Sequence, residues 1–168
     1  AFHRIPEASC HVVVHAEYGE RAAQRLEKRF GGKAVVPRCG APVGFDAVER
    51  WIMEVVTAAG SDPSPALSAI RDVRRRVATV LSRVTMLTGA PKGLTAAIST
   101  DASTALPLAK FLFEYLSVLP VSVETPNGGE TIWSNRLDAA LAQMSCTEAR
   151  HVPWQTAAPD LLLADGCQ

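Results

Sequence analysis

Apolar and polar positions follow two alternating periods along this chain, and each change of period marks a new element. A short continuous apolar run predicts a buried strand over residues 11–15, and apolar residues at helical spacing predict an amphipathic helix over 17–30. A second short run predicts a strand over 33–37, and an apolar face predicts a helix over 45–59. The order strand, helix, strand, loop, helix is typical of an α/β unit with parallel strands.

A long helix is predicted next, from a Ser/Pro-rich break at residues 61–65 to about Thr88. At 1.5 Å per residue it would extend roughly 35 Å, enough to connect two domains. Its arginines lie mostly off the apolar stripe, which favours a solvated face or salt bridges to a neighbouring domain over phosphate binding; they are Arg71, Arg74, Arg75, Arg76 and Arg83. The turn cluster at residues 89–93 marks the expected domain boundary.

A second α/β pattern follows this boundary. Strands are predicted at 94–99, 120–124 and 160–164, with a short edge strand at 149–152, and helices from Asp101 to Val118 and from Glu130 to Met144. Pro107 is compatible with its helix only near the first turn.

We therefore expect an α/β protein with two Rossmann-like parallel-sheet lobes connected by a long helix. Residues 1–62 would form part of the first domain, residues 63–92 the connecting helix and turn, and residues 93–168 a second, truncated domain.

Composition narrows the class of protein. The chain has 168 residues, of which 48% are hydrophobic, so it can bury a core. Lys+Arg and Asp+Glu both number 17, which argues against a nucleic-acid partner held by bulk charge.

No apolar run approaches the ~20 residues of a membrane span, and no export signal is recognised, so a cytoplasmic location is expected. The chain starts with Ala and stops shortly after a strand, so we expect a piece of a longer polypeptide.

Candidate binding residues lie where strands end, because open α/β sheets bind ligands past the carboxyl ends of their strands. They are His15, Cys39, Gly40, Gly44, Asp101, Asp165 and Cys167. The two glycines would let the backbone approach a large cofactor or substrate, whereas His15 could also be a hydrogen-bonded strand-end residue.

The four cysteines show no C-x-x-C spacing, and no metal site is predicted. The chain lacks a P-loop and a G-x-G-x-x-G motif, so any redox chemistry would use a borrowed cofactor and energy source.

Several phrases, taken in order, resemble the component 1 family of nitrogenase-type oxidoreductases, which includes nitrogenase subunits, cofactor scaffolds, and protochlorophyllide and chlorophyllide reductases. They are Ala8–His15, the Leu26-Glu27-x-x-Phe30-Gly31 helix end, Pro42–Ala47, the Arg-rich helix before Gly93–Ile98, and Pro159–Leu163.

The resemblance implies a homologous second subunit and a P-loop iron–sulfur reductase that carries the ATP. It also implies an iron–sulfur cluster in the intact complex, with its ligands outside this chain. In catalytic nitrogenase subunits, the strand that here ends in His15 ends in a cofactor-ligating cysteine. Because this cysteine is missing here, the resemblance fits a tetrapyrrole reductase subunit, a scaffold or another homologue better than a subunit that binds a nitrogenase cofactor through this strand. The leading hypothesis is a subunit of an ATP-dependent two-component iron–sulfur oxidoreductase, with a tetrapyrrole such as protochlorophyllide or chlorophyllide as its expected substrate.

Three alternatives remain open at this point. The first is a metal-chelate or haem-type binding module with two α/β lobes, and the second is a scaffold for nitrogenase cofactor assembly. The third is a nucleotide-sugar enzyme with paired lobes, although the expected sugar-phosphate contacts are not recognisable in the sequence.

Overall fold

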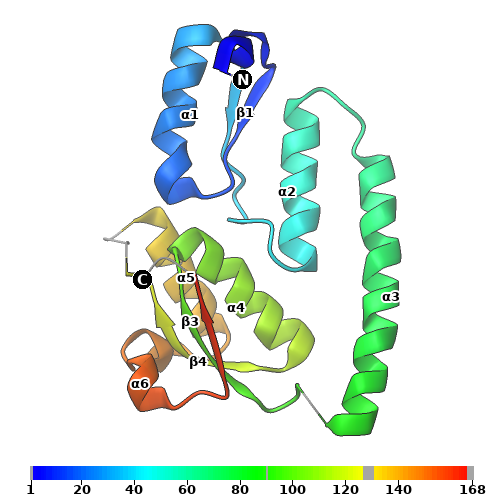
Figure 1. Cartoon of the computed structure of the whole chain (residues 1–168), viewed down its shortest axis with the longest axis vertical. Coiled ribbons are helices and arrows are strands. Elements are labelled where there is room, and N and C mark those ends of the chain that lie inside the picture. Colours follow the sequence, from blue (N-terminus) through cyan, green and yellow to red (C-terminus); the bar gives the residue numbers. More distant parts are fainter. Residues whose placement is uncertain (1, 90, 127–130, 166–168) are drawn as a thin grey trace.

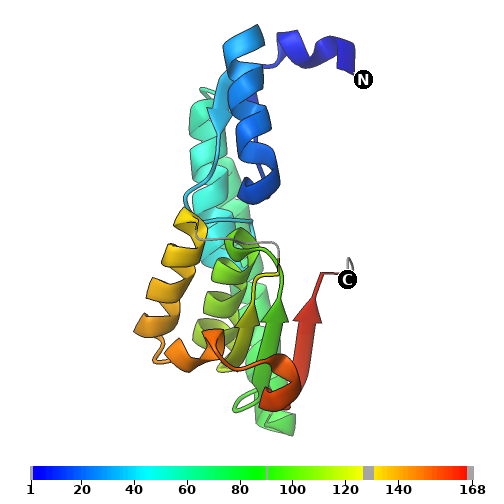
Figure 2. The same cartoon turned by 90° about the vertical axis from the view of Figure 1, so that its left-hand side faces the viewer.

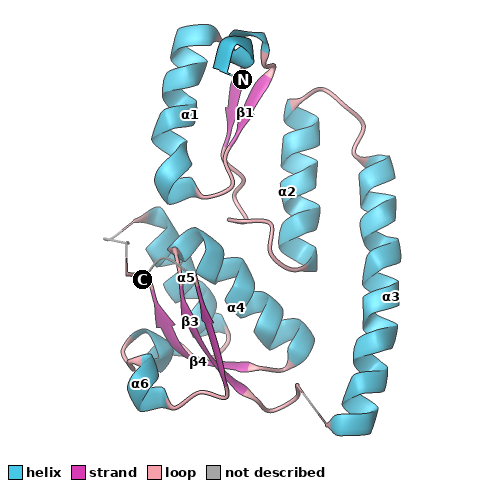
Figure 3. Cartoon of the chain, viewed as in Figure 1, coloured by secondary structure: helices cyan, strands magenta, loops and turns pink. Residues whose placement is uncertain are grey.

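The computed structural model describes residues 2–89, 91–126 and 131–165. Two α/β lobes lie one above the other, and a long helix runs alongside them (Figure 1). Figure 3 shows that each lobe combines strands with flanking helices. The chain is therefore a mixed α/β protein, as the alternation of periods predicts.

The upper lobe contains a two-stranded parallel sheet. After a short 3₁₀ helix (η1, Phe2–Glu7), strand β1 (Cys10–Val12) pairs with β2 (Lys33–Val35), with His11 opposite Ala34. Helices α1 (Ala16–Phe30) and α2 (Phe45–Ala58) pack against these strands.

Strand β1 is shorter than the predicted 11–15. The Val13 amide donates to the Val35 carbonyl at 2.9 Å, and β2 ends at that residue, so β1 has no further pairing. His15 is exposed and serves as the N-cap residue of α1.

Helix α3 (Ser64–Thr88) connects the lobes and ends at Gly89, whose φ of 74° is in the left-handed region. None of its residues is buried, and its main helical neighbour is α2. The Arg74 guanidinium lies 3.3 Å from the Asp46 carboxylate of α2 and contacts the Tyr115 hydroxyl. This arginine therefore forms the predicted salt bridge to a neighbouring lobe.

The lower lobe is built on a three-stranded parallel sheet in the order β4-β3-β5. Its elements are β3 (Thr95–Ser99), α4 (Ala102–Leu116), β4 (Leu119–Glu124), α5 (Ile132–Gln143), a 3₁₀ helix η2 (Thr147–Arg150), α6 (Trp154–Ala157) and β5 (Leu161–Ala164). The buried core lies between β3, β4, α4, α5 and η2, while β5 forms an exposed edge (Figure 2).

The edge strand predicted at 149–152 is wrong, because this segment contains the end of η2 and a turn. Ala149 is 4% exposed in the core. The Arg150 guanidinium donates to the Val123 carbonyl at 2.8 Å and to the Asp138 carboxylate at 2.9 Å. These bonds hold the segment across β4 instead of along a sheet edge.

The topology brings the carboxyl ends of both sheets toward each other. Strand β1 runs down toward the lower lobe, and β3 runs up toward α1 (Figure 1). Strand β4 lies on one side of β3 and β5 on the other, although β5 follows β4 along the chain. The strand order therefore reverses between β3 and β5. Ligands in open α/β sheets bind at such a reversal.

Candidate functional site

A cluster of polar side chains lies where the strand ends of the two lobes meet. Asp101 follows β3, is 6% exposed and is the N-cap residue of α4. Its carboxylate accepts a hydrogen bond from the Tyr18 hydroxyl at 2.8 Å and lies 3.9 Å from His15 Nδ1. Two predicted site residues from different lobes, His15 and Asp101, are thus brought together.

The N-terminus of α4 is capped by the other lobe. The Glu17 carboxylate accepts the Ser103 amide at 2.7 Å and also the Ser103 hydroxyl, whereas Asp101 makes no side-chain cap bond. A negative charge is favourable at a helix N-terminus. The Thr104 hydroxyl lies 3.3 Å from His15 Nδ1, so α1 and α4 are tied at several points.

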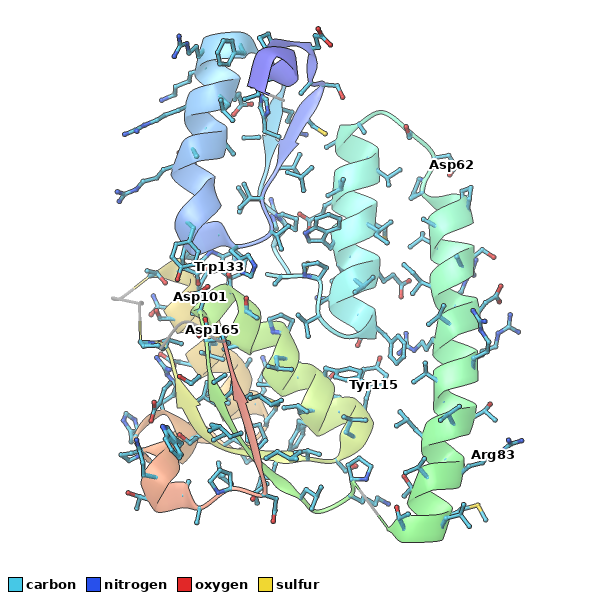
Figure 4. All side chains as sticks on the ribbon, viewed as in Figure 1. Asp62, Arg83, Asp101, Tyr115, Trp133 and Asp165 are labelled. Carbon is cyan, nitrogen blue, oxygen red and sulfur yellow. The ribbon has the colours of Figure 1, made fainter. Side chains whose placement is uncertain are left out.

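Asp165 lies at the same end of the lower lobe as Asp101 (Figure 4). Its amide donates to the Ser99 carbonyl at 3.2 Å, and its carboxylate lies 3.4 Å from the Thr100 hydroxyl. Asp165 therefore flanks the reversal between β3 and β5. Cys167 lies outside the described residues.

Gly40 allows the β2–α2 loop to lie against α4 at a distance that a larger residue would not permit. Pro107 has no amide hydrogen to donate to the Ser103 carbonyl one turn earlier, so this carbonyl accepts the Ala41 amide at 2.8 Å instead. A Cβ on Gly40 would lie 2.1 Å from the Ser103 oxygen. Pro107, which is expected near the first turn of its helix, lies in the second turn. This position is tolerated because the β2–α2 loop donates a hydrogen bond to the Ser103 carbonyl that the proline leaves unpaired.

Gly44 and Cys39 lie farther along α4, beside its middle. A Cβ on Gly44 would lie 2.8 Å from the Phe111 side chain, so this glycine also permits a contact within the protein. The Cys39 thiol donates to the Ala47 carbonyl at 3.4 Å. Burial, with help from the nearby Glu54 carboxylate, raises its pKa to about 11, so it stays protonated at neutral pH.

Several residues of this polar cluster are missing from the predicted set, among them Glu17, Tyr18 and Ser103. Glu17 and Tyr18 closely follow the predicted strand at 11–15, and this position alone could have marked them as candidate site residues. The sequence pattern instead presents both as ordinary residues of the predicted amphipathic helix over 17–30. Their partners are 86 and 83 residues away, respectively.

The described side chains do not fit a cysteine-ligated iron–sulfur cluster, which is held by thiolates. Within residues 2–89, 91–126 and 131–165, no three His, Cys, Asp or Glu side chains are placed to share a metal ion. Cys10 lies on β1, Cys39 is a protonated thiol, and Cys146 is buried in the lower core and donates to the Met144 carbonyl. The cleft supplies imidazole and carboxylate groups, which handle protons and bind polar ligands.

The family model for nitrogenase component 1 type oxidoreductases matches residues 1–165. The chain belongs to this family. It is 38% identical over 65 residues to one of the subunits of the light-independent protochlorophyllide reductase of Rhodospirillum rubrum, a match that covers 39% of this chain and 11% of that protein.

The fold agrees with this assignment. The solved structure of nitrogenase Cp1 at pH 6.5 superimposes with a TM-score of 0.67 and 19% identity, covering 96% of this chain and 31% of that chain. This component 1-type chain therefore spans about a third of the length of that solved chain. Among the helices of the described residues, none is both long enough and apolar enough to cross a membrane.

Proposed function

We propose that this chain forms the substrate cleft of a component 1-type oxidoreductase subunit that reduces a tetrapyrrole such as protochlorophyllide or chlorophyllide. The observation that carries the proposal is the convergence of strand ends, with His15 and Asp101 3.9 Å apart and the Asp165 carboxylate 3.4 Å from the hydroxyl of Thr100, the residue before Asp101. The sequence match to a protochlorophyllide reductase subunit supports the choice of substrate class.

Reduction of one carbon–carbon double bond in a tetrapyrrole takes two electrons and two protons and leaves two new C–H bonds. In this proposal the electrons come from an ATP-dependent iron–sulfur reductase that associates with this subunit and its homologous second subunit. The described cleft offers groups for the protons instead of ligands for a cluster.

His15 is the group we assign to proton delivery. Its side chain is 51% exposed, so it can reach both a substrate and solvent. The Asp101 carboxylate, 5% exposed at its side chain, and the Thr104 hydroxyl both face Nδ1. Because these partners hold Nδ1, the other ring nitrogen is free to face a ligand. Asp101 acts as a positioning residue for this imidazole.

The test uses the full-length polypeptide that contains this chain, purified anaerobically with its homologous subunit and its iron–sulfur reductase. Protochlorophyllide or chlorophyllide is added with ATP and dithionite, and product is followed by visible absorbance. We expect turnover by the wild type and a loss of at least tenfold in His15→Ala, with substrate binding retained. The matched control is His151→Ala, an exposed histidine of the lower lobe, which should keep full activity.

Other outcomes would overturn the proposal. Binding of the tetrapyrrole without ATP-dependent reduction would indicate a binding module. Transfer of a bound metal cluster to another protein, without tetrapyrrole binding, would indicate an assembly scaffold.

A further inference from the structure

A pocket lies beside the middle of α4, away from the polar cluster at the strand ends. Its cavity volume is about 310 Å³. Three segments form its walls: residues 38–50 from the β2–α2 loop and the first half of α2, residues 106–115 of α4, and residues 136–143 of α5. Neither the family comparison nor the proposed reaction assigns a role to this pocket.

Positive charge is concentrated around this pocket in a chain with no net charge. Its cationic lining residues are Arg38, Arg50, Lys110 and Arg136, and its carboxylates are Asp46 and Glu114. Asp46 is already bound to Arg74 and to the Tyr115 hydroxyl. In the described part of the chain, neither Arg50 nor Lys110 forms an ion pair. The four cationic lining residues outnumber the two carboxylates, so the pocket would attract an anion.

The remainder of the lining is apolar and aromatic. The rings of Phe45, Phe111 and Tyr115 contact one another, with centroids 5.4–5.8 Å apart. The Arg74 guanidinium lies over two of these rings, 5.8 Å from the Phe45 centroid and 5.1 Å from the Tyr115 centroid. These contacts fix the ring cluster, so the surface that remains, mainly at Phe111, is preformed and needs little ordering on binding. Ligand pockets commonly combine an apolar surface with a few polar groups that orient the ligand.

We infer that this pocket binds a small planar organic anion, with its acidic group toward Arg50 and Lys110 and its ring on the aromatic wall. Arginine and lysine recognise both phosphate and carboxylate groups. Known ligand pockets range from about 300 to 1,000 Å³, so a cavity of about 310 Å³ suits a molecule the size of a mononucleotide.

Calorimetric titration of the 168-residue chain tests this inference. Four probes separate the chemistries: AMP carries a ring and a phosphate, benzoate a ring and a carboxylate, adenosine a ring alone, and inorganic phosphate an anion alone. We expect AMP or benzoate to bind at least tenfold more tightly than both adenosine and inorganic phosphate, and the stronger of the two identifies the acidic group.

The double variant Arg50→Gln/Lys110→Gln should weaken this binding at least tenfold. Arg83→Gln is the matched control, because Arg83 is an exposed arginine on α3 that points away from the molecule (Figure 4), and its binding should match the wild type. The inference is overturned if no anionic probe binds at millimolar concentration, if inorganic phosphate binds as tightly as AMP, or if Arg83→Gln weakens binding equally. Since the readout is binding and not turnover, it stands apart from the proposed tetrapyrrole reaction.

Discussion

Replacing Gly40 by alanine should release the β2–α2 loop from α4. Gly40 has a φ of +83°, a conformation that costs an alanine roughly 1–2 kcal/mol. The added Cβ would also lie 2.1 Å from the Ser103 carbonyl oxygen, a backbone atom that cannot rotate away.

The second cost comes from the hydrogen bond beside this contact. Moving the loop far enough to relieve the clash breaks the 2.8 Å bond from the Ala41 amide to the Ser103 carbonyl. Pro107 offers no amide to replace it, and an unpaired buried acceptor costs about 1–3 kcal/mol. Together the two terms predict a loss of about 3 kcal/mol in the free energy of unfolding.

Urea denaturation followed by far-UV circular dichroism measures this loss. Gly60→Ala is the matched control, because Gly60 has a φ of +72° but nothing within 4 Å of its added Cβ. The control should lose only the conformational cost of about 1–2 kcal/mol. Equal losses in the two variants would refute the close approach of the loop to α4.

Three further changes test other contacts. Glu17→Gln removes the charge that caps α4 at Ser103 and should lower the free energy of unfolding by about 1 kcal/mol; an unchanged urea midpoint would contradict this cap. Burial and the Asp46 carboxylate raise the pKa of Tyr115 to about 12, so its neutral hydroxyl stabilises the fold fully below pH 10 and progressively less as the pH rises through 12. Tyr115→Phe should remove that alkaline loss, and the ultraviolet absorbance step near pH 12 should disappear with it. Hydrogen bonds from Thr95 lower the pKa of Asp160, so its contribution is present at neutral pH and lost as the pH falls through the lowered pKa. Asp160→Asn should reduce stability at neutral pH and flatten the acid side of the profile, and an unaltered profile would exclude this role.

The helices could be predicted closely because their signals are local. An apolar stripe and punctuation by glycine and proline define α3, whose C-terminus at Thr88 matches the predicted one. The parallel pairing within each lobe also followed from the alternation of strands and helices.

The errors fall where distant residues decide the structure. The strand pattern at residues 149–152 does not join the sheet, because Arg150 is held by β4 and α5. Likewise, β1 can pair only as far as β2 extends. Pro107 looked confined to the first turn of its helix, because the loop that uses the freed carbonyl lies far earlier in the sequence, at Ala41.

The same limit applies to the cleft. Its strand-end residues, His15, Asp101 and Asp165, follow from a general rule for parallel sheets, but the link from Glu17 to Ser103 depends on how the lobes meet. That link bears on the ligand class, because helix N-termini after a strand are common phosphate sites. Here the Glu17 carboxylate already occupies the N-terminus of α4, and a phosphate placed there would meet a like charge. The polar cluster therefore disfavours a nucleotide-sugar whose phosphates would be held at this helix N-terminus.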